Sequence, residues 1–167
     1  MLAGITIKPL KRMPDERGSF TEILRMDWKD IIGEDAINQA NLSISYPGMV
    51  RAWHKHERGQ IDYFVVVKGA LKICAYDDVT KELAEVISTG DNLQVVKVPG
   101  HYWHGFKVVG NETAMLIYFV NKLYDYTKPD ELRTAWNDPS IIPQLINGKK
   151  DDPRVGKPWD WLLPPHK

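Results

Sequence analysis

Short apolar runs, rich in β-branched and aromatic residues, recur along most of this chain and are separated by turn-forming residues. The expected strands are 3–7, 20–24, 39–45, 49–54, 62–67, 70–76, 83–88, 93–98, 104–109 and 115–120. Turn signals such as Tyr46-Pro47-Gly48 and Thr89-Gly90-Asp91-Asn92 lie between them. Strands about ten residues apart, with little helix between them, predict an antiparallel sandwich or barrel. The expected fold class is therefore all-β.

Two segments depart from this pattern. Residues 27–32 are expected to form a helical turn or two, and from about Pro139 the chain becomes a series of turns. Trp159 and Trp161 are expected to hold this tail against the body or a partner subunit, because tryptophan is highly buried on average. We expect one domain over 1–167, with a core over about 3–140 and a C-terminal arm over 141–167.

The composition excludes several classes of protein. Lysine plus arginine and aspartate plus glutamate number 22 each, and this neutral balance argues against a nucleic-acid partner. The single cysteine, Cys74, cannot form an internal disulfide, and its apolar neighbours predict a buried, inert thiol in a reducing compartment. No signal-peptide pattern or apolar run near 18 residues is present. We therefore expect a soluble cytoplasmic protein without a membrane partner.

Histidines gather in two places, Arg51-Ala52-Trp53-His54-Lys55-His56 and His101-Tyr102-Trp103-His104. Residues two apart in an extended segment point to the same face of a sheet. His54 and His56 are therefore expected to project together, with Arg51 on the other face. Neighbouring imidazoles within a β-structure indicate either proton transfer or metal binding, and these residues alone leave both open.

Two further segments are polar in a regular way. Gln39, Asn41 and Ser43 share one parity of a predicted strand, which is typical of a half-buried strand. If that face points inward, its amides are suited to read a base or a sugar. In 15–22, Phe20 and Glu22 share a face after a glycine turn, which alone indicates a solvated turn before an edge strand.

Together these pieces resemble the dTDP-4-dehydrorhamnose 3,5-epimerase family of the cupin superfamily. The matching motifs, in family order, are Asp15-x-Arg17-Gly18-x-Phe20-x-Glu22, Gln39-x-Asn41-x-Ser43, Arg51-x-x-His54, Gly69 with Asp77, Pro99 with His104-Gly105-Phe106, Tyr118, Tyr124 and Trp136-Asn137-Asp138-Pro139. The resemblance covers about residues 3 to 140. It implies a cupin-type antiparallel jelly-roll β-barrel, a homodimer, and a nucleoside-diphosphate 4-keto-6-deoxyhexose substrate for deoxysugar and polysaccharide synthesis. It also implies that no cofactor is needed.

The resemblance assigns roles to single residues. His54 matches the base that removes a proton beside the C4 ketone, and Tyr124 matches the acid that supplies a proton from the opposite face. Arg51 matches a diphosphate-binding residue, and His104 matches a histidine at the sugar end of the pocket. The set matching the nucleotide-contacting residues is Arg17, Phe20, Glu22, Gln39 and Asn41.

One departure concerns the oxygen on which negative charge develops. Where the family has a lysine near the C4 oxygen, this chain has Asp62 in the substrate-binding set. An ionised carboxylate there would repel an enolate by roughly 4 kcal/mol at about 4 Å, at an effective dielectric constant near 20. Asp62 must therefore be neutralised, turned away or used for something else. Lys72 and Lys107 are candidate replacement cations.

A second departure concerns the partner of the base. The family pairs its base with an aspartate of the C-terminal region, where this chain diverges, and Asp151, Asp152 and Asp160 are the candidates. His56 and His101 are additional histidines that the family lacks at these positions.

Two other readings stay open. Cupins that bind metals use His-x-His, a nearby carboxylate or amide, and a later histidine. His54, His56, Gln60 or Asp62, and His104 fit that template, which suits iron, manganese, nickel or zinc. A third reading is a non-catalytic sugar-nucleotide binder, or an epimerase of one carbon only. The sequence favours an epimerase acting at C3, C5 or both.

Overall fold

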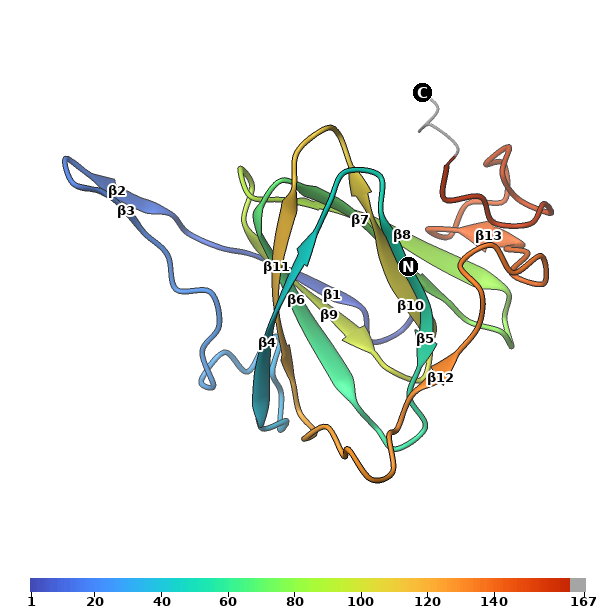
Figure 1. The fold of residues 1–167 in the computed structure, drawn as a ribbon, viewed down its shortest axis with the longest axis horizontal. Helices are drawn as coiled ribbons and strands as arrows, with labels where there is room; N and C mark the ends of the chain where they lie inside the picture. The colour runs from blue at the N-terminus through green and yellow to red at the C-terminus, as the bar shows by residue number, and fades with distance from the viewer. Residues whose placement is uncertain (163–167) are drawn as a thin grey trace.

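The computed structural model describes residues 1–162, so the last five residues of the expected C-terminal arm, 163–167, lie outside the described part. Two main sheets face each other across the body of the molecule (Figure 1). The five-stranded sheet has the order β1 (Thr6–Pro9), β9 (Gln94–Pro99), β6 (Ile61–Lys68), β11 (Ala114–Val120) and β4 (Gln39–Ser45). All of its strand pairs are antiparallel.

The six-stranded sheet forms the other wall. Its order is β12 (Leu132–Arg133), β5 (Val50–Lys55), β10 (Trp103–Val109), β7 (Ala70–Tyr76), β8 (Glu82–Thr89) and β13 (Leu145–Ile146). Among the described strands of this sheet, the β13–β8 pair alone is parallel. A separate hairpin of β2 (Met13–Asp15) and β3 (Gly18–Phe20) extends away from the body (Figure 1). This architecture confirms the expected all-β fold.

The expected and observed strands agree closely in the body of the chain. Strands 39–45 and 70–76 have the expected bounds, and the others from 49 to 120 shift by only a residue or so. The expected strand 20–24 is wrong, because β3 ends at Phe20 and the chain continues without strand structure. Residues 27–32 form turns and no assigned helix, although the Ile32 amide donates to the Trp28 carbonyl at 2.9 Å. In the described part, no helix is long and apolar enough to cross a membrane.

The main core lies between the two sheets. Phe64, Val96 and Leu116 face inward from the five-stranded sheet and pack against residues such as Ile73 and Phe106 of the other sheet. Alternation along each strand produces this core, because side chains two residues apart share a face. Burial of these apolar side chains removes much of both inner faces from water and is the main source of stability for such a sandwich.

The tail covers the outer face of the six-stranded sheet. Trp159 and Trp161 are 5% and 0% exposed, and the Trp161 ring centroid lies 4.8 Å from that of Trp53 on β5. The expectation that these tryptophans hold the tail is therefore confirmed, and their contact is with the body. Cys74 lies in the same cluster, where burial raises the pKa of its thiol and keeps it neutral.

Residues 21–37 cover the outer face of the five-stranded sheet. Ile31 and Ile32 pack there with Tyr63, and the Tyr63 hydroxyl donates to Asp35 Oδ2 at 2.7 Å. Lys97 Nζ lies 3.3 Å from the same oxygen. Although burial opposes ionisation of Asp35, these bonds and the lysine charge outweigh it and lower the pKa of the carboxyl. A charged polar group thus fastens this segment to the sheet.

Candidate active site

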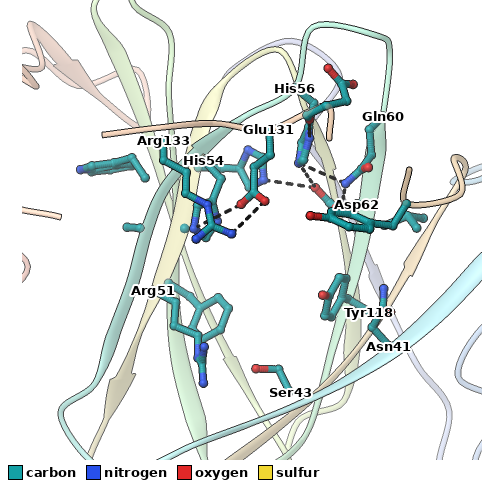
Figure 2. A pocket seen from close by; sticks show the side chains of 18 of the residues that line it. Asn41, Ser43, Arg51, His54, His56, Gln60, Asp62, Tyr118, Glu131 and Arg133 are labelled. Carbon is teal, nitrogen blue, oxygen red and sulfur yellow. Dashed lines mark hydrogen bonds and ion pairs between the residues drawn. The ribbon is translucent and has the colours of Figure 1, made fainter. Parts of the chain in front are cut away.

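A cavity of about 880 Å³ opens between the two sheets (Figure 2). The five-stranded sheet contributes the polar face of β4, with Asp62 on β6 and Tyr118 on β11. The six-stranded sheet contributes Arg51 and His54 on β5, and His104 on β10. The connection after β11, residues 121–136, borders the cavity and is called the strap below. Most of the residues selected from the sequence therefore meet in one place.

A register shift in β5 brings Arg51 and His54 to the same cavity. On β10, His104 pairs with His54, but the next residue, Gly105, pairs with Ala52. The strand thus has one extra residue at this point, which changes the parity of the face. The prediction that Arg51 lies on the other face is therefore wrong. A Cβ atom at Gly105 would lie 2.4 Å from the Ala52 Cβ atom, so only glycine fits beside the bulge.

The partner of His54 is Glu131. His54 Nε2 lies 3.7 Å from Glu131 Oε1, and Arg133 donates to Glu131 Oε2 at 2.9 Å. Strand β12 places both residues here, because Arg133 pairs with His54 across the sheet. Burial, together with the nearby His104, lowers the pKa of His54 to about 4, although Glu131 opposes this shift. The ring is therefore neutral near pH 7, as a general base must be.

None of the aspartates expected beside His54 lines the cavity. Asp152 Oδ2 accepts a hydrogen bond from Arg154 at 2.9 Å, Asp160 accepts one from the Leu162 amide at 2.8 Å, and Asp151 is exposed. The packing of the tail on the outer face of the sheet explains the error. The sequence analysis missed Glu131, because this residue lies in a loop segment just before a two-residue strand and no alternating pattern of residues marks it.

Asp62 is buried and compensated. It is 2% exposed, and its Oδ2 atom lies 3.1 Å from Nε2 of His104, which is 3% exposed. Gln60 Nε2 donates to the other oxygen of Asp62 at 3.1 Å. Burial favours neutral His104, but the hydrogen bond and charge of Asp62 outweigh it and raise the pKa of this imidazole. Asp62 is therefore not a free anion facing a substrate.

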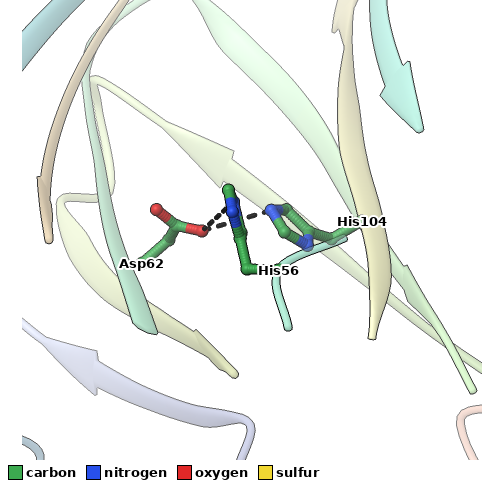
Figure 3. A group of neighbouring side chains, drawn as sticks. All are labelled: His56, Asp62 and His104. Carbon is green, nitrogen blue, oxygen red and sulfur yellow. Dashed lines mark ion pairs between the residues drawn. The ribbon is translucent and has the colours of Figure 1, made fainter. Parts of the chain in front are cut away.

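Two imidazoles converge on the carboxylate of Asp62 (Figure 3). His104 Nδ1 bonds to the Tyr102 carbonyl at 2.9 Å, and His56 Nδ1 bonds to the Asp130 carbonyl. With each Nδ1 bound to a carbonyl, each Nε2 points toward Asp62, and the three ligand atoms lie within 4.8 Å of one another. His54, the first residue of the expected metal template, is outside this group. Its ring centroid lies 6.2 Å from that of His104, in an edge-on contact.

Two tyrosines border the cavity at different depths. Tyr118 projects inward from β11, on the wall opposite His54, and its ring centroid lies 5.9 Å from that of Phe64 (Figure 2). Burial, and then the charges of Asp62 and Glu131, raise the pKa of Tyr118, so its phenol stays protonated. Tyr124 lies in the strap, 43% exposed, with its ring centroid 5.0 Å from that of Tyr126. Tyr118 lies two residues after the core residue Leu116 on β11 and therefore shares its inward face. This alternation is the sequence signal that could have identified Tyr118 as a cavity residue.

The inward polar face of β4 forms part of the cavity wall, as the sequence allowed. Gln39 is engaged within the protein, because its Nε2 donates to Asn41 Oδ1 at 2.8 Å and its Oε1 accepts the Tyr124 amide at 2.9 Å. Gln39 thus holds the beginning of the strap. Arg51 Nε donates to the Ser45 hydroxyl at 2.9 Å, which orients its guanidinium beside the cavity.

The rest of the expected nucleotide-binding set lies elsewhere. Arg17 and Phe20 are on the protruding β2–β3 hairpin, and Phe20 is 63% exposed. Glu22 accepts a hydrogen bond from Arg25 Nη1 at 2.6 Å. None of these residues lines the cavity of its own chain.

The other residues singled out lie outside the cavity. Lys72 Nζ is buried on the outer face of β7, 3.7 Å from Glu85, and Lys107 does not border the cavity either, so neither lysine replaces the family cation. His101 is exposed and rests on the ring of Tyr102, with the two centroids 4.1 Å apart.

The chain has relatives among known protein families and solved structures. Residues 13–132 match the family described as the polysaccharide biosynthesis C-terminal domain. The probable low-salt glycan biosynthesis epimerase Agl13 of Haloferax volcanii is 39% identical over 80% of this chain and 87% of that protein. The spore coat polysaccharide biosynthesis protein SpsL of Bacillus subtilis is 34% identical over 84% of this chain and 94% of its own length.

A solved structure is similar over most of the fold. The dTDP-6-deoxy-D-glucose-3,5-epimerase RmlC of Legionella pneumophila, in complex with dTDP-4-keto-L-rhamnose, superposes with a TM-score of 0.73 and 25% identity. The match covers 84% of this chain and 78% of that one. The chain thus belongs to the polysaccharide biosynthesis C-terminal domain family and has the cupin fold of the RmlC-type epimerases.

Proposed function

We propose that this protein is a sugar-nucleotide epimerase that inverts C3, C5 or both of a nucleoside-diphosphate 4-keto-6-deoxyhexose. One observation carries the proposal: a neutral histidine paired with a carboxylate faces a protonated tyrosine across a cavity between two sheets. His54 and Glu131 form one side, and Tyr118 lies on the other. An inversion needs a base and an acid on opposite faces of the sugar ring.

The chemistry follows from these positions. His54 removes the proton beside the C4 ketone, and Glu131 stabilises the imidazolium that forms. A tyrosine then delivers a proton to the opposite face of the carbon. Tyr124 is the acid by resemblance, and Tyr118 is the acid by position, because it projects into the cavity from the wall opposite His54.

Arg51 suits the diphosphate end of the substrate. Its guanidinium lies at the cavity wall, oriented by Ser45, and offers N–H groups to phosphate oxygens. Two relatives support the biological setting, since one is a probable glycan biosynthesis epimerase and the other a polysaccharide biosynthesis protein. The Legionella epimerase with bound dTDP-4-keto-L-rhamnose supports the class of substrate.

Proton NMR in deuterated buffer tests the proposal. The protein is incubated with dTDP-, UDP- and GDP-linked 4-keto-6-deoxyhexoses, and the C3 and C5 proton signals are followed. We expect loss of one or both signals with the wild type and no loss with His54→Gln. Binding without exchange for every substrate would instead indicate a non-catalytic sugar-nucleotide binder.

A second candidate function is a metal-dependent cupin enzyme. The supporting observation is that His56, Asp62 and His104 present two imidazole nitrogens and one carboxylate oxygen to a common point (Figure 3). The Asp62 Oδ2 atom lies 3.1 Å from Nε2 of His104 and 3.9 Å from Nε2 of His56. Two imidazoles and a carboxylate suit zinc, iron, manganese or nickel. A bound cation would supply Lewis-acid stabilisation of a sugar oxygen, which the missing family lysine cannot.

Metal analysis and a chelator separate the two candidates. Exchange that continues after chelation favours catalysis by His54 and the tyrosine without a metal. Loss of exchange on chelation, restored by one divalent cation, favours a metal-assisted epimerase. About one bound metal per chain with no exchange on any of the sugars would favour a different metal-dependent reaction.

The protein is also proposed to act as a homodimer. The β2–β3 hairpin extends from the body, and its paired residues Met13 and Phe20 are both exposed. Exposed apolar side chains on a projecting hairpin are suited to pack against another subunit. In this arrangement Arg17 and Phe20 reach the cavity of the partner subunit, which explains why they lie outside the cavity of their own chain.

A further inference from the structure

Asp130 holds the strap at the residue just before Glu131. Its Oδ1 atom accepts the Glu57 amide at 3.0 Å, and its Oδ2 atom accepts the Arg58 amide at 2.9 Å. Arg58 Nε lies 3.3 Å from the same carboxylate, and the carbonyl of Asp130 binds His56 Nδ1. A single residue thus fastens the strap to the β5–β6 turn through both its side chain and its backbone.

Strand β12 begins two residues later. Leu132 pairs with Lys55 and Arg133 with His54, so the backbone of the strap is fixed in register on β5 just after Glu131. Glu131 therefore lies between two attachments, the Asp130 carboxylate on one side and the β12 pairing on the other. A two-residue strand is a weak attachment alone, because few backbone hydrogen bonds hold it.

We infer that Asp130 is a positioning residue for the base: it sets the distance between the Glu131 carboxylate and the His54 ring. This inference rests on the proposed function, in which Glu131 stabilises the imidazolium of His54. The Glu131–His54 separation of 3.7 Å is longer than a hydrogen bond but within ion-pair range, so movement of the carboxylate away from the ring weakens the Coulomb attraction between them. A displacement of about 1 Å at a catalytic group can cost about 100-fold in rate.

The kinetic test is a double-mutant cycle on proton exchange. Asp130→Ala, Glu131→Gln and the double variant are compared with the wild type for kcat and KM. We expect Asp130→Ala to lower kcat about tenfold or more with little change in KM. Adding Asp130→Ala to Glu131→Gln should then cost almost nothing further, because the group through which Asp130 acts is already lost. Multiplied losses in the double variant would overturn the inference.

Asp77→Ala is the matched control. Asp77 caps the β7–β8 turn in the same way, with the Val79 amide at 2.9 Å and the Thr80 hydroxyl at 2.8 Å, but it lies outside the cavity. We expect this variant to lose stability and keep its kcat. If Asp130→Ala does not fold, Asp130→Asn takes its place in the cycle, because its amide oxygen still accepts one backbone N–H.

A spectroscopic measurement keeps the inference separate from the proposed function. The ring ¹H–¹³C signals of His54, assigned by their absence in His54→Gln, are compared among the same variants. We expect Asp130→Ala to shift them in the same direction as Glu131→Gln, and Asp77→Ala to leave them unmoved. Unmoved His54 signals in Asp130→Ala would overturn the inference. A wild type without proton exchange would overturn the proposed function alone.

Discussion

His54 on β5 faces Glu131, which lies just before β12, with 3.7 Å between the imidazole Nε2 and the carboxylate Oε1. The two residues come from segments far apart in the chain, and the pairing of β12 with β5, together with the Asp130 attachment, brings them together. This pairing gives a half-buried, neutral histidine one negative group that can stabilise its protonated form. His54 is thus neutral and able to accept a proton, and the carboxylate of Glu131 stabilises the charged ring that results.

Glu131→Gln should slow proton removal. The substitution keeps the shape of the side chain but removes the charge that stabilises the imidazolium, so we expect kcat for C3 and C5 exchange to fall about 10- to 100-fold. Glu85→Gln is the comparison, because Glu85 bonds to Arg154 at 2.8 Å on the outer face of the sheet. Equal kcat values for these two variants would exclude Glu131 from the reaction.

The two tyrosines can be separated by comparing inversion with exchange. In a variant that lacks the acid, the substrate still loses its proton to His54, but fewer protons are delivered to the opposite face of the carbon. We therefore expect Tyr118→Phe to reduce net inversion more than deuterium exchange, measured on the same NMR sample. The same selective loss in Tyr124→Phe, with Tyr118→Phe unaffected, would give the acid role to Tyr124.

The group of His56, Asp62 and His104 predicts how metal content responds to mutation. If these residues hold a divalent cation, Asp62→Asn removes the only anionic ligand, and metal per chain measured by mass spectrometry should fall at least tenfold. His101→Gln removes a histidine outside the group and should leave the metal content unchanged. If the wild-type protein binds none of zinc, iron, manganese and nickel, the metal-dependent function is excluded.

Mixed dimers test the location of the hairpin. Neither Arg17→Ala nor His54→Gln alone should be fully active. In a heterodimer of the two, one cavity would combine an intact His54 with an intact Arg17 from the partner subunit. We expect mixing by co-expression to restore a substantial share of the activity. Mixtures no more active than the sum of the separate variants would show that the hairpin does not act on the partner.

Acid should weaken the attachment of residues 21–37. The pKa of Asp35 is lowered in the folded protein, so its contribution is present above the unfolded pKa, about 3.9, and is lost as the pH falls through the folded value. Asp35→Asn should cost about 1–3 kcal/mol of unfolding free energy at pH 7 and less near pH 3, measured by urea denaturation. Asp30→Asn, at the exposed pair with Lys8, should change little at either pH. A loss for Asp35→Asn as large at pH 3 as at pH 7 would contradict the assignment.

Local patterns in the sequence predicted most of the fold. Alternation along 39–45 and the turn residues around 46–48 act within a few residues, so the strand and its polar face could be read directly, whereas the direction in which that face points could not. The face occupied by Arg51 could not, because the extra residue in β5 depends on pairing with Gly105, distant in sequence. A bulge of this kind leaves the strand pattern intact on both sides.

Site residues could be predicted only where the side chain itself indicates a chemical role, as with histidine for proton transfer and arginine for phosphate binding. His54, Arg51 and His104 fall in one cavity, as the family resemblance implied. Glu131 and the neutralisation of Asp62 by His104 arise from tertiary contacts, and no spacing in the chain encodes them. The same holds for Arg17 and Phe20, whose place on a hairpin outside the cavity also depends on the tertiary fold.

Four of the six tryptophans divide into two optical classes. Trp53, Trp159 and Trp161 are shielded within one cluster behind the wall that carries His54, whereas Trp136 is 41% exposed and borders the cavity. A ligand that enters the cavity therefore meets an indole whose emission responds to it, while the shielded group reports on the integrity of the wall. The protein carries its own fluorescent probe for occupancy and a separate one for folding.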